Sequence, residues 1–197
     1  MEFIHFLEQL KGIAQTGLYY SKDLHDRQRY TKLLELTCQV TSEKLNLDLE
    51  LVKRNFSEEA GFAAPKVGVN AAVFKDKTLL VAKRKDDGCW ELPGGWAELC
   101  ESPRETLVRE LMEETSLSVE PLDIIDVFTR LPGDFSQYYS SFHILIKCII
   151  TSGNFSPSDE TSEVKFLNED ELETLEWHRD HIEMARKAFR NQNLNFS

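Results

Sequence analysis

Residues 93–117 read PGGWAELCESPRETLVRELMEETSL, and this stretch indicates both a fold and a chemistry. Ser102 followed by Pro103 and Glu105 is typical of a helix start, with a serine cap, proline at the first helical position and a capping box. The pattern predicts a helix over 103–115. Two glycines precede it, and glycine lets backbone approach neighbouring groups closely.

Three carboxylates share one face of that predicted helix. At about 100° per residue, Glu110, Glu113 and Glu114 fall within one arc of about 100°. We expect the opposite face to pack on the core; it carries Leu107, Val108, Leu111 and Met112. Three acidic side chains within a turn repel one another.

An acidic stripe alone is more often a solvated surface than a binding site. Two features favour a site here: Arg109 lies one turn from Glu113 and can orient it, and the loop Pro93-Gly94-Gly95 brings backbone close. Clustered carboxylate oxygens suit Mg²⁺, Mn²⁺ or Ca²⁺ better than zinc. A divalent cation also allows an acidic protein to receive a phosphorylated substrate.

The rest of the chain after residue 63 mixes strands with helices. Alternating apolar residues and turn signals predict strands at 67–73, 78–82, 89–92, 122–130, 142–151 and 164–167. Asp76-Lys77 is the expected turn of the first hairpin. Further helices are expected from Asn168, with Glu171 completing a capping box, and near Arg179. The pattern predicts an α+β fold in which helices cover a mixed sheet.

The first sixty residues have helical periodicity instead. Apolar residues recur at three- and four-residue steps along 3–17, Asp23 is a suitable cap for a second helix, and a short third helix is expected over 50–56. We therefore expect two regions, a helical one at 1–62 and a mixed one at 63–197. The apolar stripe of 3–17, widened by Phe6 and Ile13, needs a partner surface, which is either the rest of the chain or a second copy of it. We predict a homodimer through residues 1 to about 60.

Composition excludes several classes of function. The chain has 197 residues, 23 basic against 34 acidic, and a net charge of −11, so DNA and anionic membranes are disfavoured partners. The longest apolar run, 144–150, is too short to cross a bilayer. Four scattered cysteines without a CxxC pair indicate free thiols and a cytoplasmic location.

The central segment resembles the Nudix box, G-x5-E-x7-R-E-U-x-E-E-x-G-U, where U is apolar. Gly95, Glu101 and the run Arg109–Leu117 match this pattern, with one departure at Ser116, where the family has glycine. That position should end the helix in a left-handed conformation, in which serine is disfavoured by about 1 kcal/mol. The N-terminal helices and LPGGWAELCESP also resemble a subgroup described as ADP-ribose or CDP-choline pyrophosphatases.

The resemblance implies an α/β/α sandwich and roles for particular residues. Metal ligands would be Glu110, Glu113 and Glu114, with a Gly94 or Gly95 carbonyl, and the ion would be Mg²⁺ or Mn²⁺. Arg109 would orient the glutamates and Glu101 would hold the loop to the helix. The reaction implied is hydrolysis of a nucleoside diphosphate linked to another moiety.

The general base is expected outside the box, because the box glutamates are already assigned as ligands. Glu160 and Glu163 are the two candidates. Glu163, at the start of the last strand, is favoured as metal-proximal ligand or base because a strand holds it more rigidly, whereas Glu160 would need loop motion to reach the site. Arg84 is a candidate phosphate contact. Base stacking is expected from an aromatic residue near the cleft, with four candidates: Trp96, Phe135, Tyr138 and Tyr139.

Two alternatives remain at this stage. RNA-end or exonucleolytic processing is disfavoured by the net charge of −11. A non-catalytic Nudix-fold ligand sensor would not need a repelling set of carboxylates. His143 lies within an expected strand, and a structural role for it is favoured over substrate contact.

Overall fold

The computed structural model describes residues 3–58, 64–137 and 139–194 and divides into two compact units. The helical unit comprises Met1–Pro65 with Arg130–Ser141, and the sheet unit comprises Lys66–Thr129 with Phe142–Ser197. The expected boundary between residues 62 and 63 lies outside the described residues. Each unit is described by itself.

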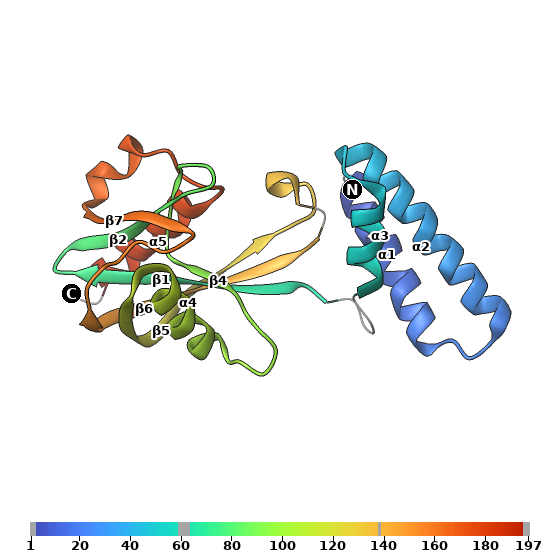
Figure 1. The fold of residues 1–197 in the computed structure, drawn as a ribbon, viewed down its shortest axis with the longest axis horizontal. Helices are drawn as coiled ribbons and strands as arrows, with labels where there is room; N and C mark the ends of the chain where they lie inside the picture. The colour runs from blue at the N-terminus through green and yellow to red at the C-terminus, as the bar shows by residue number, and fades with distance from the viewer. Residues whose placement is uncertain (1–2, 59–63, 138, 195–197) are drawn as a thin grey trace. The chain divides into compact units, whose positions relative to one another are not determined.

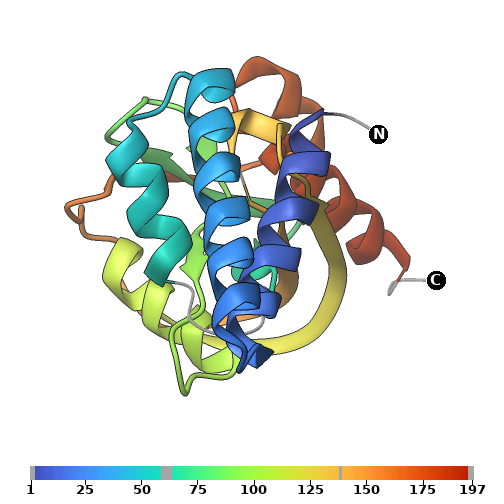
Figure 2. The same ribbon diagram turned by 90° about the vertical axis from the view of Figure 1, so that its right-hand side faces the viewer.

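Three helices form most of the helical unit: α1 (Phe3–Tyr20), α2 (Leu24–Leu45) and α3 (Leu49–Glu58). Figure 2 shows them side by side, with α2 between the other two. The cap predicted at Asp23 is confirmed, because its carboxylate accepts a 3.0 Å hydrogen bond from the Asp26 amide. Cys38, Val52 and Phe56 form the small buried core of α2 and α3.

The apolar stripe predicted for α1 is buried only in part. Leu7 and Ala14 are buried, whereas Phe3, Phe6 and Ile13 remain 49%, 45% and 56% exposed. One chain therefore covers only part of this stripe, and the predicted homodimer stays a prediction. The outer edge of the stripe is left as apolar surface on the helical unit.

Among the residues that the structure describes, seven strands form the sheet. They are β1 (Lys66–Lys75), β2 (Thr78–Arg84), β3 (Trp90–Glu91), β4 (Gly94–Trp96), β5 (Leu117–Arg130), β6 (Ser141–Gly153) and β7 (Thr161–Leu167). The last residue of β5, Arg130, and the first of β6, Ser141, are grouped with the helical unit. The strand order is β3-β2-β1-β6-β5, with β4 paired to β1 and β7 to β2 (Figure 1). The turn predicted at Asp76 is present, with φ of 56°.

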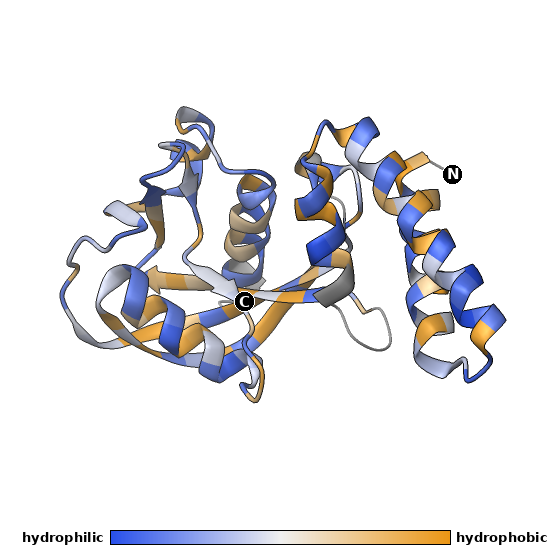
Figure 3. Ribbon diagram, turned by 45° about the vertical axis from the view of Figure 1, so that its right-hand side comes forward, coloured by the Kyte–Doolittle hydropathy of each residue, from blue (hydrophilic) through white to orange (hydrophobic). Residues whose placement is uncertain are grey.

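Helices cover both faces of this sheet. On one face, Leu107 and Leu111 of α4 (Pro103–Thr115) pack against Val69, Ala71 and Val73 of β1. On the other, Met184 and Phe189 of α5 (His181–Leu194) pack against neighbouring strands. The strands are accordingly the hydrophobic layer of the unit (Figure 3). The predicted α+β fold with an α/β/α sandwich is confirmed.

Some expected elements differ from the structure in detail. Residues 94–96, expected as loop, form β4, because Gly94 and Gly95 pair with Asn70 and Val69 of β1. The element capped by Asn168 and Glu171 is a short 3-10 helix, η2 (Glu169–Thr174), rather than an α-helix. A second 3-10 turn, η1 (Asp134–Ser136), lies between β5 and β6.

Candidate active site

Helix α4 carries the carboxylates of the candidate site, and both of its ends have the caps predicted from the sequence. Ser102 accepts a hydrogen bond from the Glu105 amide, and the Glu105 carboxylate accepts one from the Ser102 amide at 2.8 Å. Ser116 ends the helix with φ of 59° and ψ of 23°, the left-handed conformation expected where the family has glycine.

The faces of α4 differ from the prediction. Leu107 and Leu111 are buried, but Val108 and Met112 are 38% and 44% exposed. The core-facing stripe continues from Leu111 to Glu114, which is only 6% exposed. Positions 107, 111 and 114 are spaced by four and three residues and therefore share one face. The acidic face is thus not uniformly solvent-exposed, because Glu114 lies at the edge of the core.

Arg109 ties three carboxylates together. Its Nε and Nη2 donate to the two oxygens of Glu101 at 2.9 and 3.1 Å. Its Nη1 donates to Glu110 at 3.0 Å and to Glu113 at 3.1 Å. Thr106 also donates to Glu101, and hydrogen bonding to Arg109 lowers the Glu101 pKa. The Arg109 guanidinium therefore restricts the position of the Glu110 carboxylate and connects it to the carboxylate of Glu101 in the preceding loop.

Two glycines of β4 let the strand approach the carboxylates. The Gly94 amide donates a 3.0 Å hydrogen bond to Glu114 Oε2. A Cβ at Gly94 would lie 2.1 Å from the Val69 carbonyl oxygen, and a Cβ at Gly95 would lie 2.4 Å from the Glu110 carboxylate. Any side chain at these positions would occupy the space that the strand and Glu110 now fill.

Burial and neighbouring negative charges together disfavour the ionised form of the acidic side chains at this site. Burial raises the pKa of Glu114 well above its ordinary value, and the charges of Glu91, Glu110 and Glu160 raise it further. Burial likewise raises the pKa of Glu110 against the opposing effect of Arg109. The pKa of Glu91 rises to about 7 through burial. Several acidic groups held near one another favour a divalent cation in their midst.

The donor set fits a hard cation such as Mg²⁺ or Mn²⁺, which prefers carboxylate and carbonyl oxygens. Within the described ranges, no three side chains of histidine, cysteine, aspartate or glutamate form a ready-made metal cluster. Glu110 and Glu114 are the two glutamates of the box that contact β4: the Gly94 amide donates to Glu114, and the Glu110 carboxylate lies against Gly95. Glu113 is 60% exposed in its side chain and bonded to Arg109.

A cavity of about 510 Å³ lies beside these groups in the sheet unit. It is lined by Arg84, Lys85, Asp86, Glu91, Asp159 and Glu160. Arg84 donates to Glu91 at 3.0 Å and to Asp86 at 2.9 Å, so its charge is already shared between carboxylates. Glu91 was not predicted as a site residue, although its place between the apolar residues Trp90 and Leu92 of an expected strand is a signal of a buried acidic group.

The structure separates the two candidate bases. Glu160 lines the cavity, and its charge acts on Glu110 and Glu114. Glu163 is exposed on β7, where it pairs with Lys83 of β2. Strand β7 begins at Thr161, earlier than expected, so that Glu160 is the last residue before the strand.

The aromatic candidates occupy different units. Trp96 is 39% exposed and its ring lies 5.1 Å from that of His143, which is buried and bonded to Asn70 at 3.3 Å. Tyr139 belongs to the helical unit, where its carbonyl accepts a hydrogen bond from Gln137. Phe135 also belongs to that unit, and Tyr138 lies outside the described residues. Trp96 is the aromatic candidate carried by the same short strand as the glycines.

Comparison with known proteins decides the family. The model of the NUDIX domain matches residues 64–188. The chain belongs to the Nudix family. A second model, described as the UDP-X-like, N-terminal oligomerisation domain, matches residues 2–56. Nudix hydrolases generally act with divalent metals such as Mg²⁺ or Mn²⁺.

Named relatives support a pyrophosphohydrolase. The putative ADP-ribose pyrophosphatase YjhB of Bacillus subtilis is 34% identical over 169 residues, which cover 85% of this chain and 81% of that protein. The ADP-ribose pyrophosphatase of Methanocaldococcus jannaschii is 28% identical over 144 residues, covering 72% and 83%. A solved UDP-X diphosphatase is 26% identical, covers 96% of this chain and 95% of its own, and has a TM-score of 0.58. This Nudix chain is therefore a pyrophosphohydrolase. Within the described residues, every helix is too short or too polar to span a bilayer.

Proposed function

We propose that this enzyme hydrolyses the pyrophosphate bond of a nucleoside diphosphate linked to a second moiety, with Mg²⁺ or Mn²⁺ as cofactor. One observation carries the proposal: the buried Glu114 and the partly buried Glu110 both contact β4, and the charge of Glu160, at the wall of a polar cavity, acts on both. A bound divalent ion would balance their charge, neutralise the pyrophosphate and lower the pKa of an attacking water. Glu113 and the Gly94 carbonyl complete the proposed ligand set.

The other side chains have proposed roles in binding and proton transfer. Arg109 orients Glu110 and Glu113 through its hydrogen bonds. Glu160 is favoured over Glu163 as general base because it lines the cavity. Arg84, at the cavity wall, is proposed to contact a substrate phosphate. The phosphate would compete for this guanidinium with Glu91 and Asp86, which already accept hydrogen bonds from it.

The proposed substrate is ADP-ribose or a CDP-alcohol such as CDP-choline, with Trp96 of the sheet unit as the candidate contact to the base. Relatives named as ADP-ribose pyrophosphatases favour ADP-ribose. A UDP-linked substrate is a second candidate, favoured by the UDP-X diphosphatase that aligns with 96% of the chain and by the matching N-terminal domain. RNA ends are a weaker alternative because the net charge of −11 repels a polyanion, and a purely ligand-sensing role is weaker because the carboxylate set is intact.

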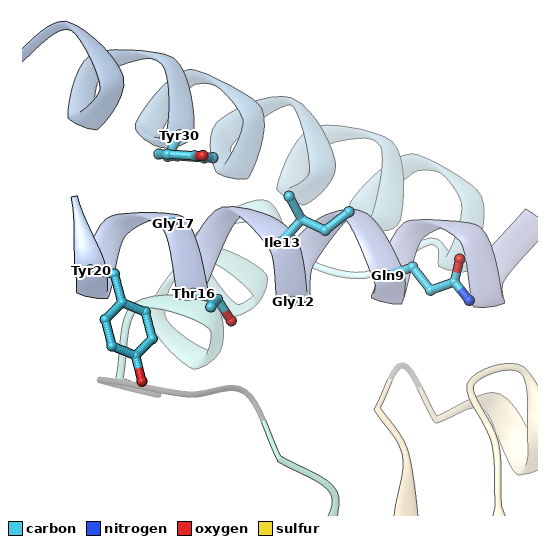
Figure 4. Close-up of a pocket in the computed structure, with 7 residues that line it drawn as sticks. All are labelled: Gln9, Gly12, Ile13, Thr16, Gly17, Tyr20 and Tyr30. Carbon is cyan, nitrogen blue, oxygen red and sulfur yellow. The ribbon is translucent and has the colours of Figure 1, made fainter.

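We further propose that residues 1–62 hold two copies together as a homodimer and that residues 63–197 form the catalytic domain. The description of the matching N-terminal domain supports an oligomer. The apolar surface of α1 supplies the contact. A cavity of about 640 Å³ on this unit is lined by Gln9, Gly12, Ile13, Thr16, Gly17, Tyr20 and Tyr30. Figure 4 shows how these residues lie on α1 and α2. A cytoplasmic location is proposed from four cysteines without a disulfide.

A substrate panel tests the chemistry. ADP-ribose, CDP-choline, UDP-glucose and a 5′-triphosphorylated RNA are each incubated with the full chain and Mg²⁺ or Mn²⁺, and phosphate products are measured. We expect one nucleoside diphosphate derivative to be cleaved to two phosphate monoesters and excess chelator to abolish cleavage. Full activity in chelator, or cleavage of the RNA alone, would contradict the proposal.

A further inference from the structure

The segment before β7 is attached to the end of β2 at one residue, Lys85. The Lys85 amide donates a 2.8 Å hydrogen bond to the carbonyl of Glu160. Its side-chain Nζ donates a 2.5 Å hydrogen bond to the carbonyl of Ser158. Lys85 therefore binds the carbonyls of Ser158 and Glu160 at the same time, one through its side chain and the other through its main chain.

Ser158 makes the bound segment internally rigid. Its hydroxyl accepts hydrogen bonds from the amides of Glu160 at 3.2 Å and Thr161 at 2.9 Å. Its own amide donates to the Thr161 carbonyl at 3.1 Å. A hydrogen bond that fixes the Ser158 carbonyl therefore also restricts the main chain at Glu160.

Electrostatic repulsion acts against this placement. The cavity that Glu160 lines also carries the carboxylates of Asp86, Glu91 and Asp159, and like charges gathered in one cavity repel one another. Glu160 is exposed and lies at the end of a loop, where outward movement would relieve that repulsion. A charge-assisted hydrogen bond is stronger than a neutral one, and Lys85 places one on this loop.

We propose that Lys85 is a positioning residue, which holds the 158–160 segment against the end of β2 so that Glu160 stays at the cavity. This inference rests on the proposed role of Glu160 as general base. Lys85 acts through Glu160 and the main chain, not on the substrate. Lys85 also lines the same cavity, which places this attachment next to the reacting groups.

A double-mutant cycle tests the inference on the full-length enzyme. Lys85→Met keeps the main-chain hydrogen bond and removes the one from Nζ. We expect kcat to fall about tenfold with KM within twofold. In a Glu160→Gln background the same change should have no further effect, and Lys85→Arg should restore most of the rate because a guanidinium can donate to the same carbonyl.

Hydrogen exchange of the peptide covering 154–162 provides a readout independent of catalysis. Lys85→Met should speed exchange there, whereas Lys77→Met, an exposed lysine at the opposite end of β2, should change neither exchange nor kcat. Unchanged exchange in Lys85→Met, or a full tenfold fall added to Glu160→Gln, would overturn the positioning role. If Glu160→Gln alone keeps the wild-type kcat, the base assignment fails, and the exchange result separately decides whether Lys85 holds the loop.

Discussion

Gly95→Ala should inactivate the enzyme without unfolding it. The added Cβ would lie 2.4 Å from Cδ and Oε1 of Glu110, where ordinary contacts begin at 3.4 Å, so the carboxylate must move by about 1 Å. A displacement of about 1 Å at a catalytic group costs on the order of 100-fold in rate, or about 2.7 kcal/mol. Stability should change little, because the displaced atoms are the far end of a flexible side chain.

Gly88→Ala is the matched control. Gly88 has φ of +72° and no atom within 4 Å of its would-be Cβ. Alanine there should cost about 1 kcal/mol of stability through backbone strain while leaving kcat unchanged. The two variants therefore have opposite expected profiles, one losing rate and the other losing stability.

The measurements are kcat on the substrate that the panel identifies, thermal unfolding by circular dichroism, and Mn²⁺ affinity by electron paramagnetic resonance. The affinity is included because Glu110 is a proposed ligand. A Gly95→Ala variant with kcat within threefold of wild type would refute the reasoning. So would loss of rate that is accompanied by an equally large loss of stability.

Three further changes test other parts of the structure. Glu114→Gln should lower kcat at least about 100-fold, yet its melting temperature in chelator should be equal or higher, because burial already disfavours the charged carboxylate. Ser116→Gly should raise the stability of the catalytic domain by about 1 kcal/mol, seen as a rise of about 2–4 °C in melting temperature, because glycine adopts φ of 59° without strain. Ile13→Glu, at a side chain 56% exposed on α1, should convert a dimer to a monomer in light scattering while the isolated chain stays folded.

Each of these has a contradicting outcome. A strongly destabilised Glu114→Gln would mean that the charged form supports the fold. An unchanged melting temperature for Ser116→Gly would show that serine is not strained there. A wild-type chain of 22.8 kDa at micromolar concentration would remove the dimer proposal before any mutation is made.

Local signals were sufficient where neighbours in sequence satisfy one another. The capping box at Ser102, the turn at Asp76 and the left-handed Ser116 depend on hydrogen bonds or φ values within a few residues. The Arg109–Glu113 pair is similar, since helical spacing alone brings the two side chains together. Such features can be predicted without knowledge of the tertiary fold.

Burial on α4 could not be predicted in the same way. The periodicity placed Val108 and Met112 inside and treated Glu114 as solvent-exposed, but the sheet meets the helix on the face of Leu107, Leu111 and Glu114. Hydrophobicity identifies an apolar side of a helix, whereas the packed neighbour decides how far around the helix burial extends. The depth of Glu114 follows from the position of β4.

Residue types at fixed spacing were enough to predict the family and the α+β fold, because the Nudix box and the alternation of strands and helices are local patterns. The bounds of the two regions and the set of metal-ligating residues, predicted from the same patterns, stay predictions. Only the tertiary structure decided which groups meet across the cavity. Glu91, Lys85 and Glu160 come from β3, the end of β2 and the segment before β7, and no spacing in the chain relates them. Strand pairing between β2 and β7 brings these segments together, and such pairing is set by long-range packing that local sequence does not encode.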